Sequence, residues 1–536
     1  MKTIIAFLLS LIIVAFGQPV FSNTISIIAA IGGFVPLFYI LRNQSAKRRF
    51  WYGTLFFTYV QLIQLYWLTS HPYSYIYIVW ALLSFLMGLQ FGLITYFATA
   101  ARLQRLSGPF FLASLWTLLE WSRLFFLTGF IFNPIGLSLA ASSWALQTAS
   151  LFGIYGLSFL VMLMNGFVTR FVIEKSFKAI AATLLIIAAP FLFGALRLST
   201  KNVTHSPAFN AIIIQTKIMP EELETNGAKK NLVEEGLQTW KEIVEALEPF
   251  KSRAPFDLIL LPEIVVPYDG QAPIYLLERV SAFIHSPLSP LGFSTENIAY
   301  VSSWAISSAI ADEFKTPLLV GLEGSEISPQ LRRKVYFNSA FFIRPANRVE
   351  KHKVEERYDK SILLPMAEEI PADWLKPLAA QYGLADSFQK GKGVVLFSSQ
   401  NNTIATSVCY EDTFQSLLRD ATFQGAHILT NVTNDGWYPN SLLGDEHFEL
   451  ARLRAVENGR PLIRSCNFGV SGAFDAYGNV VRSVNSDTMQ KSVEAFEVNV
   501  PATALSTPFT SWGNAPLLLF CLFVVALWHN STNKRD

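Results

Sequence analysis

Charged residues are scarce in this sequence, and the scarcity is uneven. Asp, Glu, Lys and Arg make up 15% of the 536 residues, whereas soluble domains usually contain about 25%. Long apolar runs fill residues 1–200 and return at 508–536, while 201–507 have the composition of an ordinary globular domain. The sequence therefore predicts a transmembrane bundle, a water-soluble domain and a final transmembrane helix with a short tail.

Cysteine and net charge are also low. The three cysteines, Cys409, Cys466 and Cys521, form no CxxC pair, and Cys521 lies in an apolar run. These features argue against a disulfide framework or a structural zinc site, and we expect no metal and no other cofactor. A net charge of +2 gives no support for nucleic acid as a partner.

The apolar runs predict about eight membrane spans, because a bilayer core needs about 20 apolar residues per helix. The expected spans are 3–21, 24–41, 50–69, 75–100, 109–132, 150–169, 178–198 and 509–528. The first run, which follows Lys2, is also compatible with a cleaved signal peptide. Whether the first span is retained stays open at this point.

The loops between these spans predict an orientation. Lys and Arg follow the second, fourth, sixth and eighth spans, whereas the alternate loops 17–23, 70–74 and 133–149 contain neither residue. Basic loops mark the cytoplasmic side. We therefore expect both termini in the cytoplasm and residues 201–507 on the outer face.

One pair of ionisable residues interrupts the fifth span. Glu120 and Arg123 are three residues apart and so share a helix face. Charges at such depth are costly and are usually paired or functional. We favour the structural interpretation, an ion pair within the helix that holds the bundle together.

Between 201 and 507, short β-branched runs alternate with helical patterns, which predicts an α/β layered fold. Gly478-Asn479 is typical of a hairpin turn between two late strands, and helical patterns cover 221–248 and 446–458. The expected strands are 210–215, 257–263, 318–322, 335–343, 394–397, 403–409, 427–431 and 461–467.

Three residues at the ends of such segments form a set with a chemical meaning. Glu263 ends an apolar strand, Lys360 follows Tyr358-Asp359, and Cys409 closes another strand. A carboxylate base, an ammonium that stabilises an oxyanion and a thiol nucleophile are the parts of a covalent acyl-transfer site. Taken alone, each residue also has a purely structural interpretation. Glu263 could be a turn residue, Lys360 a solvated surface charge and Cys409 a small buried apolar side chain. His447 is an alternative base for Cys409, although on a helical pattern a structural role is favoured.

The sequence motifs around these residues resemble those of a known family. Leu261-Pro262-Glu263, Tyr358-Asp359-Lys360 and Cys409-Tyr410-Glu411 resemble the Glu-Lys-Cys signatures of the carbon–nitrogen hydrolase (nitrilase) superfamily. The membrane spans make the chain similar to the apolipoprotein N-acyltransferases within it. Four further motifs of this family have counterparts in the chain. They are E-W-x-R at 120–123, K-x-x-L-x-P-F-G-E-x-x-P at 360–371, N-D-x-W at 434–437 and H-x-x-x-A-R-x-R-A-x-E-x-G-R-P at 447–461. Met366-Ala367 replaces the family's F-G.

This resemblance implies an αββα sandwich for the soluble domain and assigns roles to its residues. Glu263 would be the general base, Lys360 the oxyanion-stabilising lysine and Cys409 the nucleophile. Glu368 would be a supporting carboxylate, and Tyr410 and Glu411 would be pocket residues.

The resemblance also implies a reaction and a location. Cys409 would take an acyl chain from a membrane phospholipid as a thioester and pass it to the α-amine of a lipoprotein's N-terminal diacylglyceryl-cysteine. The enzyme would lie in a bacterial inner membrane, with the catalytic domain on the outer face, and we expect a monomer.

Two other functions remain open from the sequence. A membrane-anchored amidohydrolase could use the same three residues with water as the acyl acceptor. A catalytically silent scaffold or transporter is disfavoured because Glu263, Lys360 and Cys409 are all present. The preferred head group, the acyl chain, the acceptor lipoproteins and the substrate entry route are not predicted.

Overall fold

The computed structural model describes residues 1–126, 129–200, 207–219, 232–284, 300–329, 331–345, 356–370, 372–381, 388–399 and 402–533. By internal contacts the chain forms two compact units. A helical unit comprises residues 1–204, 456–459 and 506–536, and an α/β unit comprises 205–455 and 460–505. The domain limits expected at 200/201 and 507/508 stay a prediction.

The helical unit contains a helix in each of the eight expected spans. Its main helices are α1 (Lys2–Ala15), α2 (Asn23–Ile28), α3 (Val35–Leu41), α4 (Ala46–Gln64), α5 (Ile76–Phe97), α7 (Ser107–Ser122), α10 (Ala149–Glu174), α11 (Phe177–Ser199) and α20 (Ala515–Asn533). Shorter elements connect them: η1 (Ala29–Gly33), η2 (Tyr66–Ser70), α6 (Ala100–Gln104), η3 (Arg123–Phe125), α8 (Leu137–Ala140), α9 (Ser143–Leu146) and α19 (Pro508–Trp512).

Among the described residues, four helical stretches are long and apolar enough to cross a membrane. They are Asn23–Leu41, Ile76–Phe97, Ala149–Glu174 and Phe177–Ser199. Lys2–Ala15 and Ala515–Trp528 are shorter apolar helices. The presence of apolar membrane-type helices is therefore confirmed, and the number that cross the bilayer stays a prediction.

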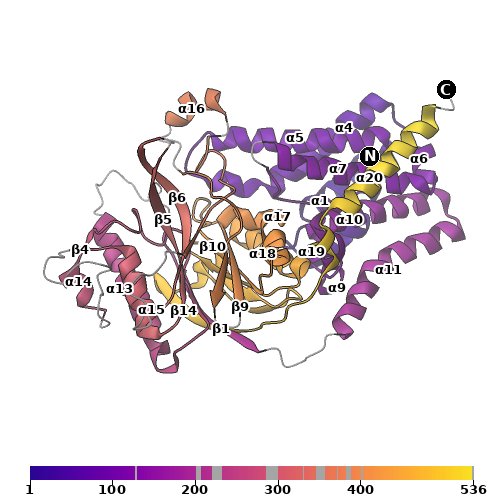
Figure 1. Ribbon diagram of the computed structural model, residues 1–536. Helices are drawn as coiled ribbons and strands as arrows, with labels where there is room; N and C mark the ends of the chain where they lie inside the picture. The colour runs from indigo at the N-terminus through magenta and orange to yellow at the C-terminus, as the bar shows by residue number, and fades with distance from the viewer. Residues whose placement is uncertain are drawn as a thin grey trace. The chain divides into compact units, whose positions relative to one another are not determined.

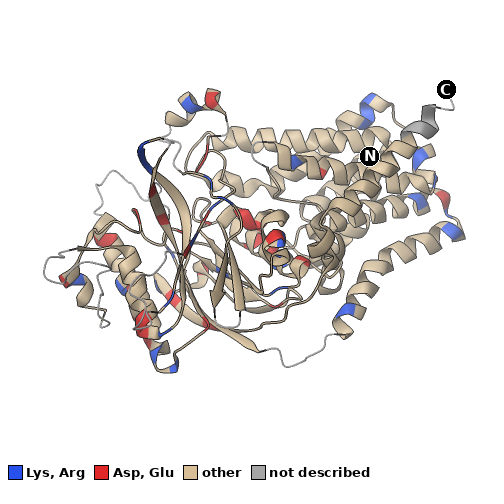
Figure 2. Ribbon diagram, viewed as in Figure 1, with Lys and Arg blue, Asp and Glu red and all other residues tan. Residues whose placement is uncertain are grey.

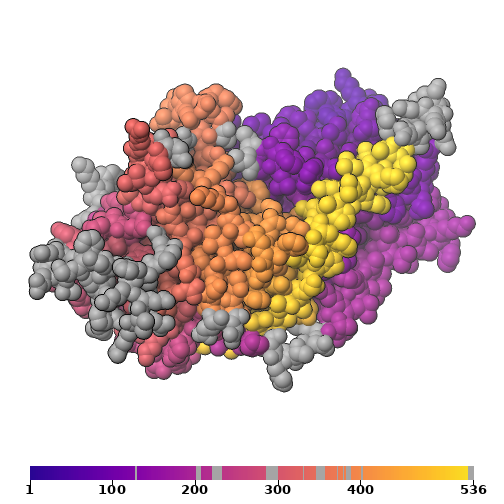
Figure 3. All heavy atoms as spheres, in the orientation of Figure 1, coloured from indigo at the N-terminus to yellow at the C-terminus, as the bar shows by residue number. Residues whose placement is uncertain are grey.

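Close packing joins these helices through small residues and aromatic rings. Gly53 of α4 faces Thr95 of α5 so closely that a Cβ atom at Gly53 would lie 1.9 Å from the Thr95 hydroxyl oxygen. Small residues allow this approach where helices pack inside a membrane. The C-terminal helix α20 lies along the surface of the unit (Figure 3), and its Trp528 stacks on Phe111 of α7 with ring centroids 4.9 Å apart.

The pair predicted in the fifth span is buried but only loosely joined. Arg123 Nη1 lies 3.9 Å from Glu120 Oε1. Each side chain has a closer partner elsewhere: Arg123 Nε donates to Gln90 Oε1 at 2.8 Å, and Glu120 Oε1 accepts from Ile135 N at 3.1 Å. Both residues thus tie α7 to other segments, in agreement with a structural role.

A single asparagine supports the irregular turn between α2 and α3. The π-helical turn η1 interrupts the regular hydrogen bonding there. Asn165 of α10 accepts from Phe34 N at 2.8 Å and donates to Ala30 O at 2.9 Å. Its amide therefore satisfies backbone groups that have no water to bind in an apolar surrounding.

The α/β unit is built on two six-stranded sheets with orders β14-β1-β2-β5-β6-β7 and β13-β12-β11-β10-β9-β8. The first contains β1 (Ala208–Thr216), β2 (Leu258–Leu260), β5 (Leu318–Ser328), β6 (Arg333–Ile343), β7 (Glu356–Asp359) and β14 (Val493–Pro501). The second contains β8 (Leu396–Ser399), β9 (Asn402–Val408), β10 (Ile428–Thr433), β11 (Leu462–Cys466), β12 (Val470–Phe474) and β13 (Val480–Asn485). All eight expected strands and the expected hairpin, between β12 and β13, are present.

Side-chain alternation along the strands explains the layers. In β1, Phe209, Ala211 and Ile213 belong to the core between the two sheets, whereas Ile212 and Ile214 belong to the core under the helices. Successive side chains point to opposite faces of a strand, so a strand with apolar residues on both faces needs cover on both. The result is the αββα sandwich that the family resemblance implies.

The helical layers are visible in Figure 1. The helices α13 (Leu232–Leu247) and α15 (Ser303–Phe314) cover the first sheet, and α17 (Gln415–Phe423) and α18 (Leu443–Asn458) cover the second. The helical pattern expected over 221–248 is confirmed from 232 onward, and 221–231 lie outside the described residues. The remaining short elements are η4 (Glu248–Arg253), β3 (Tyr275–Leu276), α14 (Leu277–Ser281), β4 (Tyr300–Val301), η5 (Asp373–Leu375), α16 (Lys376–Ala380), η6 (Cys409–Thr413) and η7 (Ser486–Thr488).

We expect Asn165→Leu to destabilise the helical unit, because leucine fills similar space but leaves Phe34 N and Ala30 O without their partner. The free energy of unfolding should fall by at least about 2 kcal/mol, measured by denaturant titration in detergent. Asn43→Leu makes the same chemical change at an exposed position and serves as the control. An equal loss in both variants would contradict this role of Asn165.

Candidate active site

The three residues singled out from the sequence meet in the α/β unit. Glu263 follows β2 and Lys360 follows β7, both in the first sheet, and Cys409 follows β9 in the second sheet. Lys360 is 1% exposed and Glu263 is 6% exposed. Both β2 and β9 pair with parallel neighbours, and the base and the thiol follow their carboxyl ends. Such strand ends commonly form sites in α/β folds.

A buried ammonium lies between two carboxylates. Lys360 Nζ lies 2.8 Å from Glu368 Oε1 and 3.3 Å from Glu263 Oε1. Asn338 of β6 bridges the same two oxygens, with Nδ2 2.7 Å from each. Leu364 N donates to the other oxygen of Glu368 at 2.7 Å. Glu368 is thus fixed on both oxygens and in turn fixes the lysine.

The environment sets the charges of these groups. Burial raises the pKa of Glu263, and the neighbouring Glu368 adds to that rise against the opposing effect of Lys360. Burial alone would lower the pKa of Lys360, but Glu368 and Glu263 outweigh it and raise that pKa. Lys360 is therefore an ammonium throughout the neutral range, and Glu263 is a stronger base than an ordinary carboxylate.

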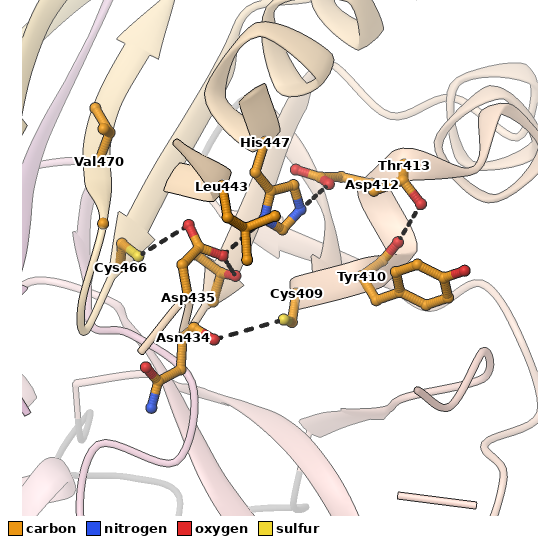
Figure 4. Close-up of polar contacts among 12 residues, drawn as sticks. Cys409, Tyr410, Asp412, Thr413, Asn434, Asp435, Leu443, His447, Cys466 and Val470 are labelled. Atoms are coloured by element: carbon orange, nitrogen blue, oxygen red, sulfur yellow. Dashed lines mark hydrogen bonds and ion pairs between the residues drawn. The ribbon is translucent and has the colours of Figure 1, made fainter. Parts of the chain in front are cut away.

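Cys409 adopts a backbone conformation that is unusual for its residue type. Its φ is +50°, in the left-handed region that non-glycine residues rarely occupy. This conformation ends β9 abruptly and begins the turn η6. The sulfur lies 3.9 Å from the carbonyl oxygen of Asn434 (Figure 4). Strain of this kind concentrates at functional sites.

The thiol of Cys409 interacts with the other two residues. It lies within hydrogen-bonding reach of Glu263, and that contact lowers the pKa of the carboxylate. Burial and the negative charge of Glu263 raise the pKa of Cys409, although Lys360 opposes them. The resting sulfur is therefore protonated, and the nearby Glu263 carboxylate can accept its proton.

The backbone at Glu263 is held from two directions. A Cβ atom at Gly321 of β5 would lie 2.5 Å from Glu263 Cα, so only glycine permits this approach. Gly321 N donates to Pro262 O at 3.1 Å. From the segment after β11, Asn467 donates a side-chain hydrogen bond to the carbonyl oxygen of Glu263.

Glu411 connects the lysine segment to the cysteine turn. It is fully buried and accepts from Ser361 N at 2.7 Å, Ile362 N at 2.9 Å and Val408 N at 2.8 Å, and from the Tyr358 hydroxyl at 2.7 Å. Burial raises the pKa of Glu411, and these donors work against that rise. The carboxylate therefore fixes the segment after β7 against the start of η6.

Tyr410 is buried beside the nucleophile, and its ring makes an edge contact with Phe414 at 5.0 Å between centroids. Figure 4 shows the ring directed away from the sulfur of Cys409. Its role as a pocket residue stays a prediction.

Asn338 is the residue of this group that the sequence reasoning missed. A single polar amide inside the apolar strand pattern at 335–343 is the signal that marks it.

His447 does not face Cys409 as a base would, because its two ring nitrogens lie 2.6 Å from Asp412 Oδ1 and 2.7 Å from Asp435 Oδ1. Among the described residues, no group of three or more His, Cys, Asp and Glu side chains is arranged to hold a metal ion.

Comparison with known proteins relates both units to described families. The sequence model of the carbon–nitrogen hydrolase family matches residues 213–498, more than half of the chain. The model of the apolipoprotein N-acyltransferase N-terminal domain matches residues 11–167. The carbon–nitrogen hydrolase of Helicobacter pylori is a structural neighbour with 17% identity and a TM-score of 0.35, covering 60% of this chain and 94% of its own.

Curated relatives extend over most of the length. The apolipoprotein N-acyltransferase of Chlamydia caviae is 28% identical, over 98% of this chain and 97% of the relative. That of Rickettsia typhi is 28% identical, over 77% of this chain and 74% of the relative. The chain thus belongs to the carbon–nitrogen hydrolase family and, within it, to the apolipoprotein N-acyltransferases.

Proposed function

We propose that this enzyme transfers a fatty acyl chain from a membrane phospholipid, through a thioester on Cys409, to the α-amine of the N-terminal diacylglyceryl-cysteine of lipoproteins. The observation that carries the proposal is the cluster of the buried Glu263 and Lys360 with the half-buried Cys409. It occurs in a chain that matches both the apolipoprotein N-acyltransferase N-terminal domain and the carbon–nitrogen hydrolase family.

Two lipid-borne substrates require a membrane protein, and the apolar helices support that requirement. We further propose a bacterial inner membrane, with both termini cytoplasmic and the catalytic residues on the outer face. Figure 2 supports this orientation, since most Lys and Arg residues of the helical unit gather near one end of its helices. Basic residues favour the cytoplasmic side. We propose that the enzyme acts as a monomer.

In the first half-reaction, the sulfur of Cys409 attacks the ester carbonyl carbon of the phospholipid while its proton passes to Glu263. The carbonyl oxygen gains negative charge, which the Lys360 ammonium stabilises. The carbon–oxygen bond of the ester then breaks, and protonated Glu263 returns the proton to the departing lysophospholipid oxygen. A thioester on Cys409 and a lysophospholipid with a free hydroxyl group result.

In the second half-reaction, the lipoprotein amine attacks the thioester carbonyl carbon. Glu263 takes a proton from the amine, and Lys360 again stabilises the oxyanion. The carbon–sulfur bond breaks, and the sulfur recovers a proton from Glu263. The covalent intermediate divides one difficult transfer into two easier steps.

The surrounding residues have supporting roles in this scheme. Glu368 orients Lys360, because its Oε1 lies 2.8 Å from the lysine Nζ. Asn338 orients Glu263 and Glu368, because its Nδ2 donates to an oxygen of each at 2.7 Å. Glu411 holds the cysteine turn through backbone donors on both sides. Tyr410 would line the acyl pocket.

A membrane-anchored amidohydrolase is the competing function, because the same residues can deliver an acyl group to water. The match to the apolipoprotein N-acyltransferase N-terminal domain over 11–167 favours transfer. A soluble amide substrate would gain nothing from such a helical unit.

We expect the purified enzyme, given phospholipid and a synthetic diacylated lipopeptide, to form a new amide at the lipopeptide amine. Liquid chromatography with mass spectrometry separates this product from free fatty acid. Lys360→Met should slow amide formation by about 10²–10³-fold, because it removes an oxyanion-stabilising charge. Lys392→Met, at an exposed position, should leave the rate unchanged. Free fatty acid as the only product would instead establish the hydrolase.

The raised pKa of Glu263 predicts an unusual acidic limit for acylation. Glu263 accepts a proton only as a carboxylate, and it becomes protonated as the pH falls through its raised pKa. We expect the rate of thioester formation to be half-maximal at a pH above 4.5, the ordinary value for glutamate. Rapid acid quench followed by mass spectrometry measures this rate between about pH 4 and 8. A half-maximal rate at or below pH 4.5 would mean that Glu263 is not the base.

A further inference from the structure

A second ionic cluster lies next to the nucleophile turn. It consists of Asp412 in η6, Asp435 in the segment after β10, His447 of α18 and Arg464 of β11. All four are buried, with exposed fractions between 0% and 4%. The half-reactions described above use none of them.

His447 lies between the two aspartates in this cluster (Figure 4). Its Nε2 is 2.6 Å from Asp412 Oδ1, and its Nδ1 is 2.7 Å from Asp435 Oδ1. Arg464 contacts the remaining oxygens, with Nη1 2.9 Å from Asp412 Oδ2 and Nη2 2.9 Å from Asp435 Oδ2. The two aspartates are therefore joined twice, once by an imidazole and once by a guanidinium.

The two aspartate contacts favour protons on both nitrogens of His447. A neutral imidazole has one nitrogen without a proton, and here that nitrogen would face a carboxylate oxygen at less than 3 Å. Arg464 Nη2 also lies 2.9 Å from Nδ1, an unfavourable contact for an imidazolium. Two carboxylates outweigh it: burial and Arg464 lower the pKa of His447, but Asp412 and Asp435 raise it to about 9.

The cluster reaches Cys409 along three routes. Asp412 belongs to the same short turn as Cys409, and Asp435 follows Asn434, whose carbonyl oxygen is 3.9 Å from the sulfur. Arg464 Nη1 also donates to Asn431 Oδ1 at 2.7 Å, and Asn431 Nδ2 donates to the carbonyl oxygen of Cys409 at 3.3 Å. By contacting Asp412 and Asp435, His447 therefore fixes both the turn η6 and the Asn434 segment, which contacts the sulfur.

The charge of the cluster also acts on the sulfur. The negative charge of Asp435 raises the pKa of Cys409. With His447 protonated, two cations match two carboxylates. With His447 neutral, one negative charge remains uncompensated beside the thiol and disfavours its ionisation.

We propose that His447 is a positioning residue for the nucleophile, holding the Cys409 turn against the Asn434 segment as an imidazolium and cancelling the charge of one buried aspartate. This inference rests on the proposal that Cys409 is the nucleophile. His447 itself touches no reacting atom.

The charged groups that face His447 come from three elements: Asp412 from η6, Asp435 from the segment after β10 and Arg464 from β11. The Cys466 sulfur of β11 lies 3.7 Å from Asp435 Oδ2. On α18 itself, Asp445 and Glu446 precede His447. Arg464 stays charged, because Asp435 and Asp412 outweigh its burial and raise its pKa.

The test is the alkylation rate of Cys409 by iodoacetamide as a function of pH, read on its own peptide by mass spectrometry. This assay needs neither phospholipid nor acceptor, so its outcome is independent of whether acyl transfer occurs. We expect His447→Gln to move the alkylation profile upward by roughly one pH unit and to slow alkylation at neutral pH about tenfold. His427→Gln, the same change at an exposed histidine, should leave the profile in place.

A double variant separates charge from shape. His447→Gln with Asp435→Asn removes one cation and one anion, and we expect its profile to return to within about half a pH unit of the wild type. If His447→Gln alone fails to fold, as judged by gel filtration and thermal unfolding, the double variant still decides. Either of two results would overturn the proposal. One is a pH profile of alkylation for the double variant that lies a full pH unit from that of the wild type, and the other is an unshifted profile for folded His447→Gln.

Stability gives an independent measure of the imidazolium. Because the folded-state pKa of His447 is raised from 6.5 to about 9, its contribution is fully present below pH 6.5 and is lost as the pH rises through 9. The thermal unfolding midpoint of the wild type should therefore fall over this range, and the double variant should show a smaller fall. Equal falls in the two proteins would contradict a charged His447.

Discussion

The site depends on the burial of one ammonium group. Moving a lysine charge out of water costs several kcal/mol, and only close, well-oriented carboxylates offset that cost. Lys360 meets this condition through Glu368 at 2.8 Å and Glu263 at 3.3 Å. Because β5 and β6 separate β2 from β7 in the sheet, the ion pairs form only when four strands are in register. The chemistry is thus coupled to the fold of the whole first sheet.

Two charged clusters with different net charges act on the nucleophile. On one side, Glu263 and Glu368 exceed the single charge of Lys360, which keeps the Cys409 sulfur protonated until a base can take the proton. On the other side, protonated His447 and Arg464 match Asp412 and Asp435. A sulfur held as a thiol beside a carboxylate reacts fastest with a substrate whose oxyanion Lys360 can stabilise.

Sequence patterns located the strands and the reactive residues because both are encoded locally. Alternation and β-branched runs marked eight strands, and the family motifs marked Glu263, Lys360 and Cys409. The strand β7 (Glu356–Asp359) was missed, since its charged residues lack an apolar alternation. Asn338 and the partners of His447 were missed for another reason: their contacts join residues up to 75 positions apart, and only the packed sheets bring them together. The break of the second span at η1 also depends on a distant residue, Asn165.

The central claim is that Cys409 carries the acyl chain. Its most direct test is to incubate the detergent-purified protein with phospholipid and no acceptor, and to search the Cys409 peptide for an acyl adduct by mass spectrometry. The account predicts an adduct with the mass of a phospholipid fatty acyl chain, labile to hydroxylamine and absent from Cys409→Ser as a thioester. A folded wild-type protein that releases lysophospholipid without ever forming that adduct would contradict it.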